Sequence, residues 1–167
     1  MMKRLLGAVA LVSVMAPCAL AQGADAGCEA YASFDQPVAQ REAAAGQYNW
    51  QVAQILLNRV SAITLQPIDA VQFVAAPERA PGEGVFAGMI SFVTPVAGTY
   101  RVALSEDVPV DLLNSDGESY PPLDSPGVSG CAGVGKVLAF DLQPGAYILQ
   151  FTEKAESGLT LMVSRAE

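Results

Sequence analysis

The 167-residue sequence contains no histidine. Histidine is the commonest general base in enzymes and the commonest protein ligand of catalytic zinc and iron. Its absence excludes a Ser-His-Asp triad, a cysteine nucleophile paired with histidine, and an iron site made of two histidines and one carboxylate. Any enzyme chemistry would therefore have to use carboxylates, or a serine activated by a lysine.

Basic residues are scarce as well, because 9 Lys and Arg stand against 17 Asp and Glu, a formal net charge of −8. The sequence has no basic cluster that offsets this balance. A surface of this charge repels phosphate backbones, so we expect no nucleic-acid partner.

The start of the chain has the pattern of a secretory signal peptide over residues 1–21. Two basic residues precede an uncharged run that ends in the A-x-A site Ala19-Leu20-Ala21. We therefore expect a periplasmic or secreted protein with a single domain over residues 22–167 and no integral membrane segment after cleavage. An uncleaved membrane anchor and a lipoprotein attached at Cys18 are the alternatives.

Cysteine is also rare, with three residues in all. Cys18 would leave with the signal peptide, so that Cys28 and Cys131 remain. The sequence has no C-x-x-C motif and no histidine that could complete a metal site with them. In an oxidising compartment an isolated pair of cysteines forms a disulfide, and we predict a structural Cys28–Cys131 bond.

From Ile63 onward, apolar residues alternate with a period of two, in short runs separated by Pro, Gly, Asp and Ser. This pattern is typical of an antiparallel β-sandwich or jelly roll. The expected fold class is therefore all-β, an antiparallel β-sandwich or jelly roll with a short N-terminal helix. The expected strands lie near residues 85–93, 98–104, 108–113, 137–142, 146–151 and 159–163.

Turn and helix signals refine this fold. Gln143-Pro144-Gly145 predicts a hairpin between its flanking strands, because proline presets the turn's φ and glycine accepts a positive one. Asp35-Gln36-Pro37 and Gly46 are start and stop signals for a short helix over residues 37–45. Residues 48–62 are ambiguous between helix and strand.

The sequence has one weak metal candidate, the acidic turn that contains Asn114, Asp116 and Glu118. Calcium prefers oxygen ligands, and alternating acidic positions on a glycine-containing loop can converge on one ion. The spacing lacks the full EF-hand pattern, and the simpler interpretation is a solvated turn. We expect no transition metal and no other cofactor.

Other candidate site residues carry weaker signals. A carboxylate-pair hydrolase or a Ser-Lys dyad has no local motif here, and the dyad would use Lys136 or Lys154. Tyr31, Tyr48 and Trp50 lie in the irregular N-terminal third and are weak candidates for a ligand surface. The possible paired carboxylates are Glu106, Asp107, Asp111 and Asp141.

Two stretches of the second half resemble a family of short secreted proteobacterial β-sandwich proteins. Residues 97–113 match its G-T-Y-R-V-A-L…D half, and residues 131–150 match its C-x-G-x-x-K-x-x-x-F-x-L-x-P-G-x-Y-x-L-Q half. Some members are labelled homogentisate 1,2-dioxygenase, a chemistry that needs ferrous iron held by histidines, which this chain lacks. More distantly, the pattern is similar to the bacterial pre-peptidase C-terminal domain, a small jelly roll. The resemblance implies a β-sandwich and assigns no functional residue.

These observations favour an exported, non-enzymatic binding or accessory protein of the bacterial cell envelope. Its partner would be an unidentified envelope protein or a small ligand. The alternatives are a hydrolase with a carboxylate pair and a calcium-binding carbohydrate-recognition module. An exposed apolar or aromatic patch would favour the binding protein, and an acidic cleft would favour the enzyme.

Overall fold

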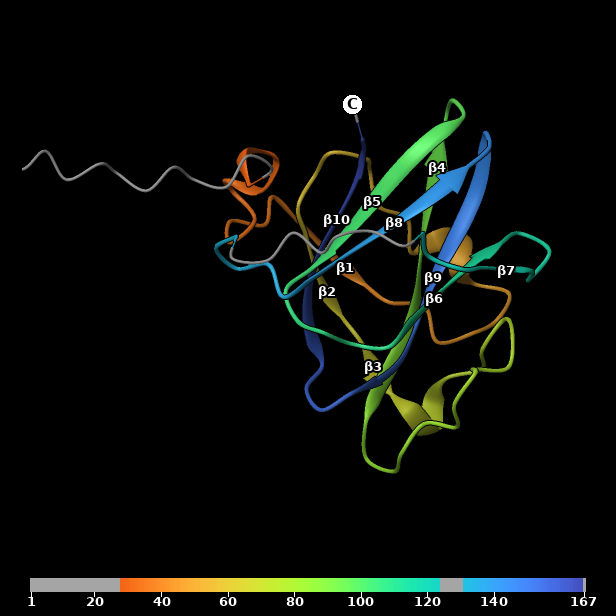
Figure 1. Cartoon of the computed structure of the whole chain (residues 1–167). Helices are drawn as coiled ribbons and strands as arrows, with labels where there is room; N and C mark the ends of the chain where they lie inside the picture. Colours follow the sequence, from red (N-terminus) through yellow and green to blue (C-terminus); the bar gives the residue numbers. More distant parts are fainter. Residues whose placement is uncertain (1–27, 124–130, 167) are drawn as a thin grey trace, which may run out of the picture.

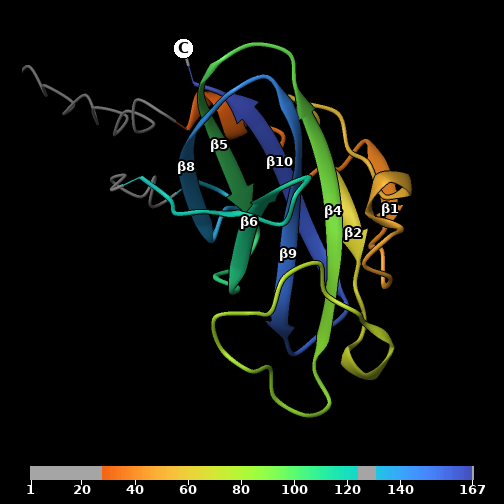
Figure 2. The ribbon, with the colours of Figure 1, turned by 90° about the vertical axis from the view of Figure 1, so that its right-hand side faces the viewer.

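The computed structural model describes residues 28–123 and 131–166 (Figure 1). The expected signal peptide and its cleavage site lie outside the described residues. Two five-stranded sheets face each other, so the predicted all-β sandwich is confirmed (Figures 1 and 2). Nowhere in the described ranges is a helix long and apolar enough to cross a membrane.

The first sheet, called sheet A, has the strand order β1-β2-β10-β5-β8. Its neighbouring strands are antiparallel except for β1 and β2, which are parallel. The strands are β1 (Ala39–Glu42), β2 (Ser61–Thr64), β5 (Gly98–Leu104), β8 (Lys136–Leu142) and β10 (Gly158–Arg165).

The second sheet, called sheet B, is antiparallel throughout and has the order β3-β4-β9-β6-β7. Two four-strand rows, β2-β10-β5-β8 and β4-β9-β6-β7, follow the jelly-roll order, and β1 and β3 extend one edge of each sheet. The strands are β3 (Gln66–Pro67), β4 (Phe86–Thr94), β6 (Val110–Asn114), β7 (Ser119–Tyr120) and β9 (Gly145–Lys154). Three short 3-10 helices complete the described part: η1 (Glu29–Tyr31), η2 (Trp50–Val52) and η3 (Ile68–Ala70).

The main hydrophobic core lies between the two sheets and contains alternate residues of the central strands. Phe92 of β4 and Tyr147 of β9 are cross-strand neighbours, and their rings stack with centroids 5.8 Å apart. Burying one large apolar side chain of this kind is worth roughly 1.5–3 kcal/mol. The core also buries Tyr100, Phe140 and Phe151 almost completely.

The predicted hairpin at the Gln143-Pro144-Gly145 turn is wrong. The turn connects β8 of sheet A to β9 of sheet B, and the two strands do not pair with each other. The Thr94 hydroxyl fixes the turn, because it donates to the Gln143 carbonyl at 2.6 Å and accepts from the Gly145 N–H at 3.1 Å. Turn residues specify that the chain reverses, whereas the partner of each strand is decided by which apolar faces meet across the core.

The predicted helix over residues 37–45 is also wrong, because these residues contain β1. The strand lies parallel to β2, with Ala39 opposite Ser61. An isolated helix of this length is marginal in water, whereas pairing with β2 satisfies the backbone within a sheet. The ambiguous residues 48–62 contain η2 and then reach β2.

One edge of β4 pairs with β9, and the chain that follows β1 covers part of the other edge. Ala44 exchanges two backbone hydrogen bonds with Met89, at 2.9 and 3.0 Å. Gly88 allows this close approach, because it has a φ of 155° and a Cβ there would lie 2.6 Å from the Cβ of Ala43. A side chain at position 88 would therefore separate the two segments.

The N-terminal segment covers the outer face of sheet A and is attached by the predicted disulfide, which is confirmed. The Cα atoms of Cys28 and Cys131 are 5.3 Å apart. Tyr31 and Phe34 of this segment pack edge to face and form a second, smaller core on the sheet. The row of sheet residues in this core crosses three strands and consists of Met162, Ala103 and Val137.

The segment of residues 71–75, called the strap, covers the outer face of sheet B (Figure 2). Gln150, in the central strand β9, is fully buried and binds the strap through its side-chain amide. Its Oε1 accepts hydrogen bonds from the backbone N–H groups of Val74 and Ala75, at 3.1 and 3.3 Å, and its Nε2 donates to the Ala75 carbonyl at 3.0 Å. One side chain thus satisfies three backbone groups of a loop that has no strand partner of its own.

We expect the Cys28→Ser/Cys131→Ser variant to lose about 2–5 kcal/mol of unfolding free energy. The bond joins residues 103 positions apart and so restricts the unfolded chain strongly. Urea unfolding followed by circular dichroism measures the loss. An unchanged urea midpoint, or alkylatable thiols at Cys28 and Cys131 in unreduced protein purified from an oxidising compartment, would contradict this assignment.

We expect Gln150→Ala to lower the unfolding free energy by about 1–3 kcal/mol, because it leaves buried backbone groups of the strap without partners. Hydrogen exchange at the Val74 and Ala75 amides should become faster. Gln40→Ala, at an exposed position of β1, is the matched control. Equal stability of the two variants would show that the strap does not depend on the Gln150 amide.

Candidate functional site

The acidic turn between β6 and β7 is organised by Asn114. Its Oδ1 accepts hydrogen bonds from the backbone N–H groups of Asp116 and Glu118, both at 2.9 Å, and its Nδ2 donates to Glu118 Oε2 at 2.8 Å. These bonds make a self-contained turn of the Asx type. Within residues 28–123 and 131–166, no group of three or more His, Cys, Asp and Glu side chains is arranged to hold a metal ion. The calcium site stays a prediction.

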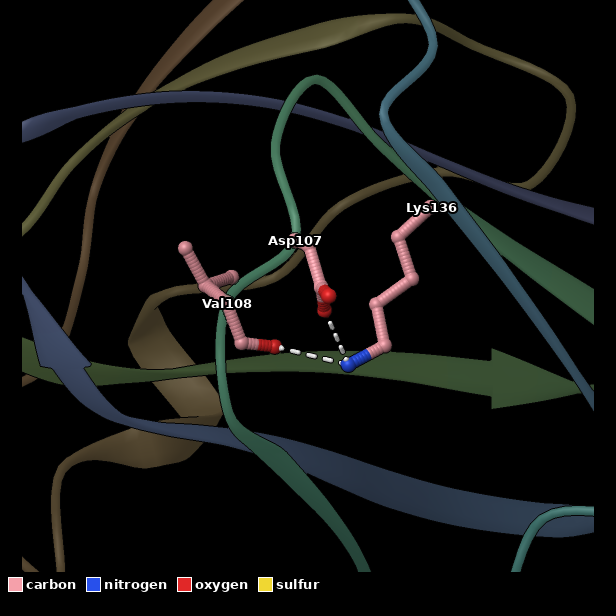
Figure 3. Close-up of polar contacts among 3 residues, drawn as sticks. All are labelled: Asp107, Val108 and Lys136. Atoms are coloured by element: carbon pink, nitrogen blue, oxygen red, sulfur yellow. Dashed lines mark hydrogen bonds and ion pairs between the residues drawn. The ribbon is translucent and has the colours of Figure 1, made fainter. Parts of the chain in front are cut away.

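Two ion pairs hold the loop that crosses from β5 in sheet A to β6 in sheet B. Lys136 of β8 lies 2.7 Å from Asp107 Oδ1 and donates a hydrogen bond to the Val108 carbonyl at 3.2 Å (Figure 3). Lys154 of β9 lies 3.1 Å from Glu106, and its side chain is only 3% exposed. Two adjacent acidic residues therefore bind one lysine from each sheet and connect the sheets at this end of the sandwich.

These contacts bear on the enzyme candidates. Both lysine ammonium groups bind carboxylates, an arrangement that holds a loop and does not place a base beside a serine. Asp141 accepts a hydrogen bond from the Thr99 hydroxyl at 2.6 Å, in a different part of sheet A. The four candidate carboxylates therefore lie in three different places. Glu106 and Asp107 are in the β5–β6 loop, Asp141 is on sheet A, and Asp111 is on the outer face of sheet B.

Asp111 is the candidate carboxylate with a perturbed environment. Burial raises its pKa, the hydrogen bond from Gln150 Nε2 at 3.4 Å opposes this shift, and the negative charge of Glu78 adds to it. A hollow of about 320 Å³ lies beside it. The charged lining residues of this hollow have both signs: Glu78, Asp111 and Glu153 with Arg79 and Lys136.

The structure does not bring the three aromatic candidates together. Tyr31 is 2% exposed and belongs to the small core under the N-terminal segment. Trp50 is partly buried against the main core. Tyr48 is 81% exposed, so it alone of the three presents most of its side chain to a partner.

Tyr48 begins a segment, residues 48–56, that carries several exposed apolar side chains. Val52 is 83% exposed and Leu56 is 59% exposed. Backbone hydrogen bonds of 2.9 Å join Ala53 and Ile55 to β4, and both of these side chains are buried. The segment is therefore fixed to the sandwich by its buried residues and exposes the others.

Sequence reasoning identified Tyr48 but missed Val52 and Leu56. Residues 52–55 alternate between exposed and buried positions, as in an extended chain on a sheet edge. An extended chain was therefore the interpretation that would have pointed to the exposed side chains. A helical spacing fits much of the same region, so the pattern did not decide which side chains are exposed.

We expect Asp111→Asn to raise the unfolding free energy at pH 7 and to have no effect near pH 3. A carboxyl group whose folded-state pKa is raised stabilises the fold when protonated, and this contribution is lost as the pH rises from the unfolded value of about 3.8 through the folded value. The asparagine Oδ1 can still accept the bond from Gln150. Urea unfolding of both proteins between pH 3 and pH 7 tests this, and a destabilised variant at pH 7 would refute the assigned burial cost.

The sequence matches no protein-family model and no curated protein. The resemblance to the secreted proteobacterial β-sandwich proteins therefore rests on the motifs of residues 97–113 and 131–150. It stays a prediction, as do the signal peptide and the location that it implies.

Proposed function

We propose that this chain is an exported, non-enzymatic binding or accessory protein of the bacterial cell envelope, and that residues 48–56 contact a protein partner. The observation that carries the proposal is the exposure of Tyr48, Val52 and Leu56 on a segment whose backbone is anchored to β4. Single exposed apolar residues are common on protein surfaces, but three large ones within nine residues favour an interface.

The anchoring supports this function physically. A segment that is already ordered by its bonds to β4 loses little conformational freedom on association, so that more of the contact energy appears as affinity. Tyrosine contributes a large, rigid and partly polar contact surface. The net charge of −8 favours a partner whose surface around the apolar contact is basic.

Location and catalysis form part of the same proposal. The Cys28–Cys131 disulfide is compatible with a periplasmic or extracellular protein, because such bonds persist in oxidising compartments. The ion pairs of Lys136 and Lys154 and the internal bonds of the acidic turn give these charged groups structural roles. This supports a binding protein over a hydrolase.

We expect Tyr48→Ser/Val52→Ser to abolish binding to this partner without changing the melting temperature, since both side chains are exposed. Quantitative affinity capture from a periplasmic extract, with the oxidised protein as bait, compares wild type, the double variant and a control. Leu123→Ser is the control, because Leu123 is also an exposed apolar residue. Its backbone N–H donates to the Ala139 carbonyl of β8, the edge strand of sheet A opposite β1, whereas residues 48–56 bind β4 of sheet B.

A protein retained by wild type and Leu123→Ser but lost with the double variant supports the proposal. Equal retention by all three baits, or no specific protein with any of them, overturns it. A crosslink from a photoreactive residue at position 52 to the same partner provides an independent measurement.

A further inference from the structure

The N-terminal segment, residues 28–36, lies on sheet A without joining its backbone ladder. Within the described ranges, every backbone hydrogen bond of this segment is internal, such as the one from the Tyr31 N–H to the Cys28 carbonyl at 2.9 Å. A backbone bond to the sandwich follows only at Val38, whose N–H donates at 3.1 Å to the carbonyl of Val60, directly before β2. Apolar packing and the disulfide therefore attach the segment.

Two aromatic side chains of the segment provide the packing. Tyr31 is 2% exposed and Phe34 is 1% exposed, and both belong to the smaller core on the outer face of sheet A. The segment covers a row of apolar residues that crosses β10, β5 and β8. This row consists of Met162, Ala103 and Val137.

The disulfide joins the segment to a part of the chain that is bonded to the sandwich. Cys131 begins a short turn, in which its carbonyl accepts the Val134 N–H at 3.1 Å. The next residue, Gly135, donates its N–H to the Leu104 carbonyl at the end of β5, at 2.9 Å. One end of the disulfide is thus fixed by backbone bonds to a sheet, and the other end holds a segment that lacks them.

We propose that the disulfide is a redox-sensitive switch, and that its reduction releases the N-terminal segment from sheet A while the sandwich stays folded. The reductant is a dithiol. It gives up two electrons and two protons, its own sulfurs join in a disulfide, and the Cys28–Cys131 bond is replaced by two thiols. A segment with few bonds to its surroundings opens locally, before the strands that carry a full ladder.

The sandwich does not need the segment for its main core. The described residues of that core all lie at or after Ala43, and they are buried between the two sheets. Release of the segment uncovers the row of Met162, Ala103 and Val137, so the reduced protein presents an apolar surface on sheet A that the oxidised protein hides. This switch is independent of the interface proposed for residues 48–56.

Reduction of the folded, disulfide-bonded protein with dithiothreitol, without denaturant, tests the switch. Thiol alkylation shows when the bond is broken, and chymotrypsin then reports on opening, because cleavage of a locally opened segment follows the population of the open form. We expect cleavage after Tyr31 and Phe34 to become at least about tenfold faster. Cleavage after Phe92 and Tyr147 of the main core should stay as slow as in the oxidised protein, and a dye that binds apolar surface should bind more strongly.

Two variants and one reagent provide the controls. Cys28→Ser/Cys131→Ser should show the reduced pattern without any reductant, and oxidised dithiothreitol should leave the wild type unchanged. Phe34→Ala should speed cleavage after Tyr31 in the reduced protein by a further factor of about five, because it removes buried apolar contacts. Val38→Ala is its matched control, since Val38 is 71% exposed and follows the segment.

The Val38→Ala variant should be cleaved like the wild type in both redox states. A bond that resists dithiothreitol in the folded protein, or unchanged cleavage after Tyr31 and Phe34 once both thiols are free, would overturn the proposal. Faster cleavage after Phe92 and Tyr147 would overturn it as well, because it would show that reduction unfolds the whole sandwich.

Discussion

The structure depends on covering the outer faces of two sheets whose inner faces already form the main core. A jelly roll with both outer faces in water would expose Met162, Ala103 and Val137 on sheet A and Met89 and Ile148 on sheet B, which the structure buries. Irregular segments provide the cover on both sides. Because such segments have no ladder of strand bonds, each needs a specific attachment, and the chain uses a different one on each face.

On sheet A the attachment is covalent. The Cys28–Cys131 disulfide brings Tyr31 and Phe34 onto the row of apolar residues across β10, β5 and β8. On sheet B the attachment is a single buried amide, because the Gln150 side chain binds the strap at Val74 and Ala75. Residues 48–56, which are proposed as an interface, lie along the edge of β4.

Two lysines have structural roles in the sandwich. Lys136 and Lys154 hold the β5–β6 loop to both sheets through Asp107 and Glu106, at an end of the sandwich where the chain passes from one layer to the other.

The class of fold, the approximate positions of six strands and the disulfide could all be predicted from the order of the residues alone. Strand positions follow from local alternation, as in residues 98–104, which form β5 with the predicted bounds. The disulfide follows from counting the cysteines outside the expected signal peptide. Three features became visible only in the assembled fold: β8 and β9 lie in different sheets, residues 39–42 pair with β2, and Tyr31 is buried while Tyr48 is exposed. Alternation of apolar residues shows only which face of its own sheet a residue occupies. Strand pairing and the covering of a sheet face depend instead on contacts between distant segments that compete for the same surface.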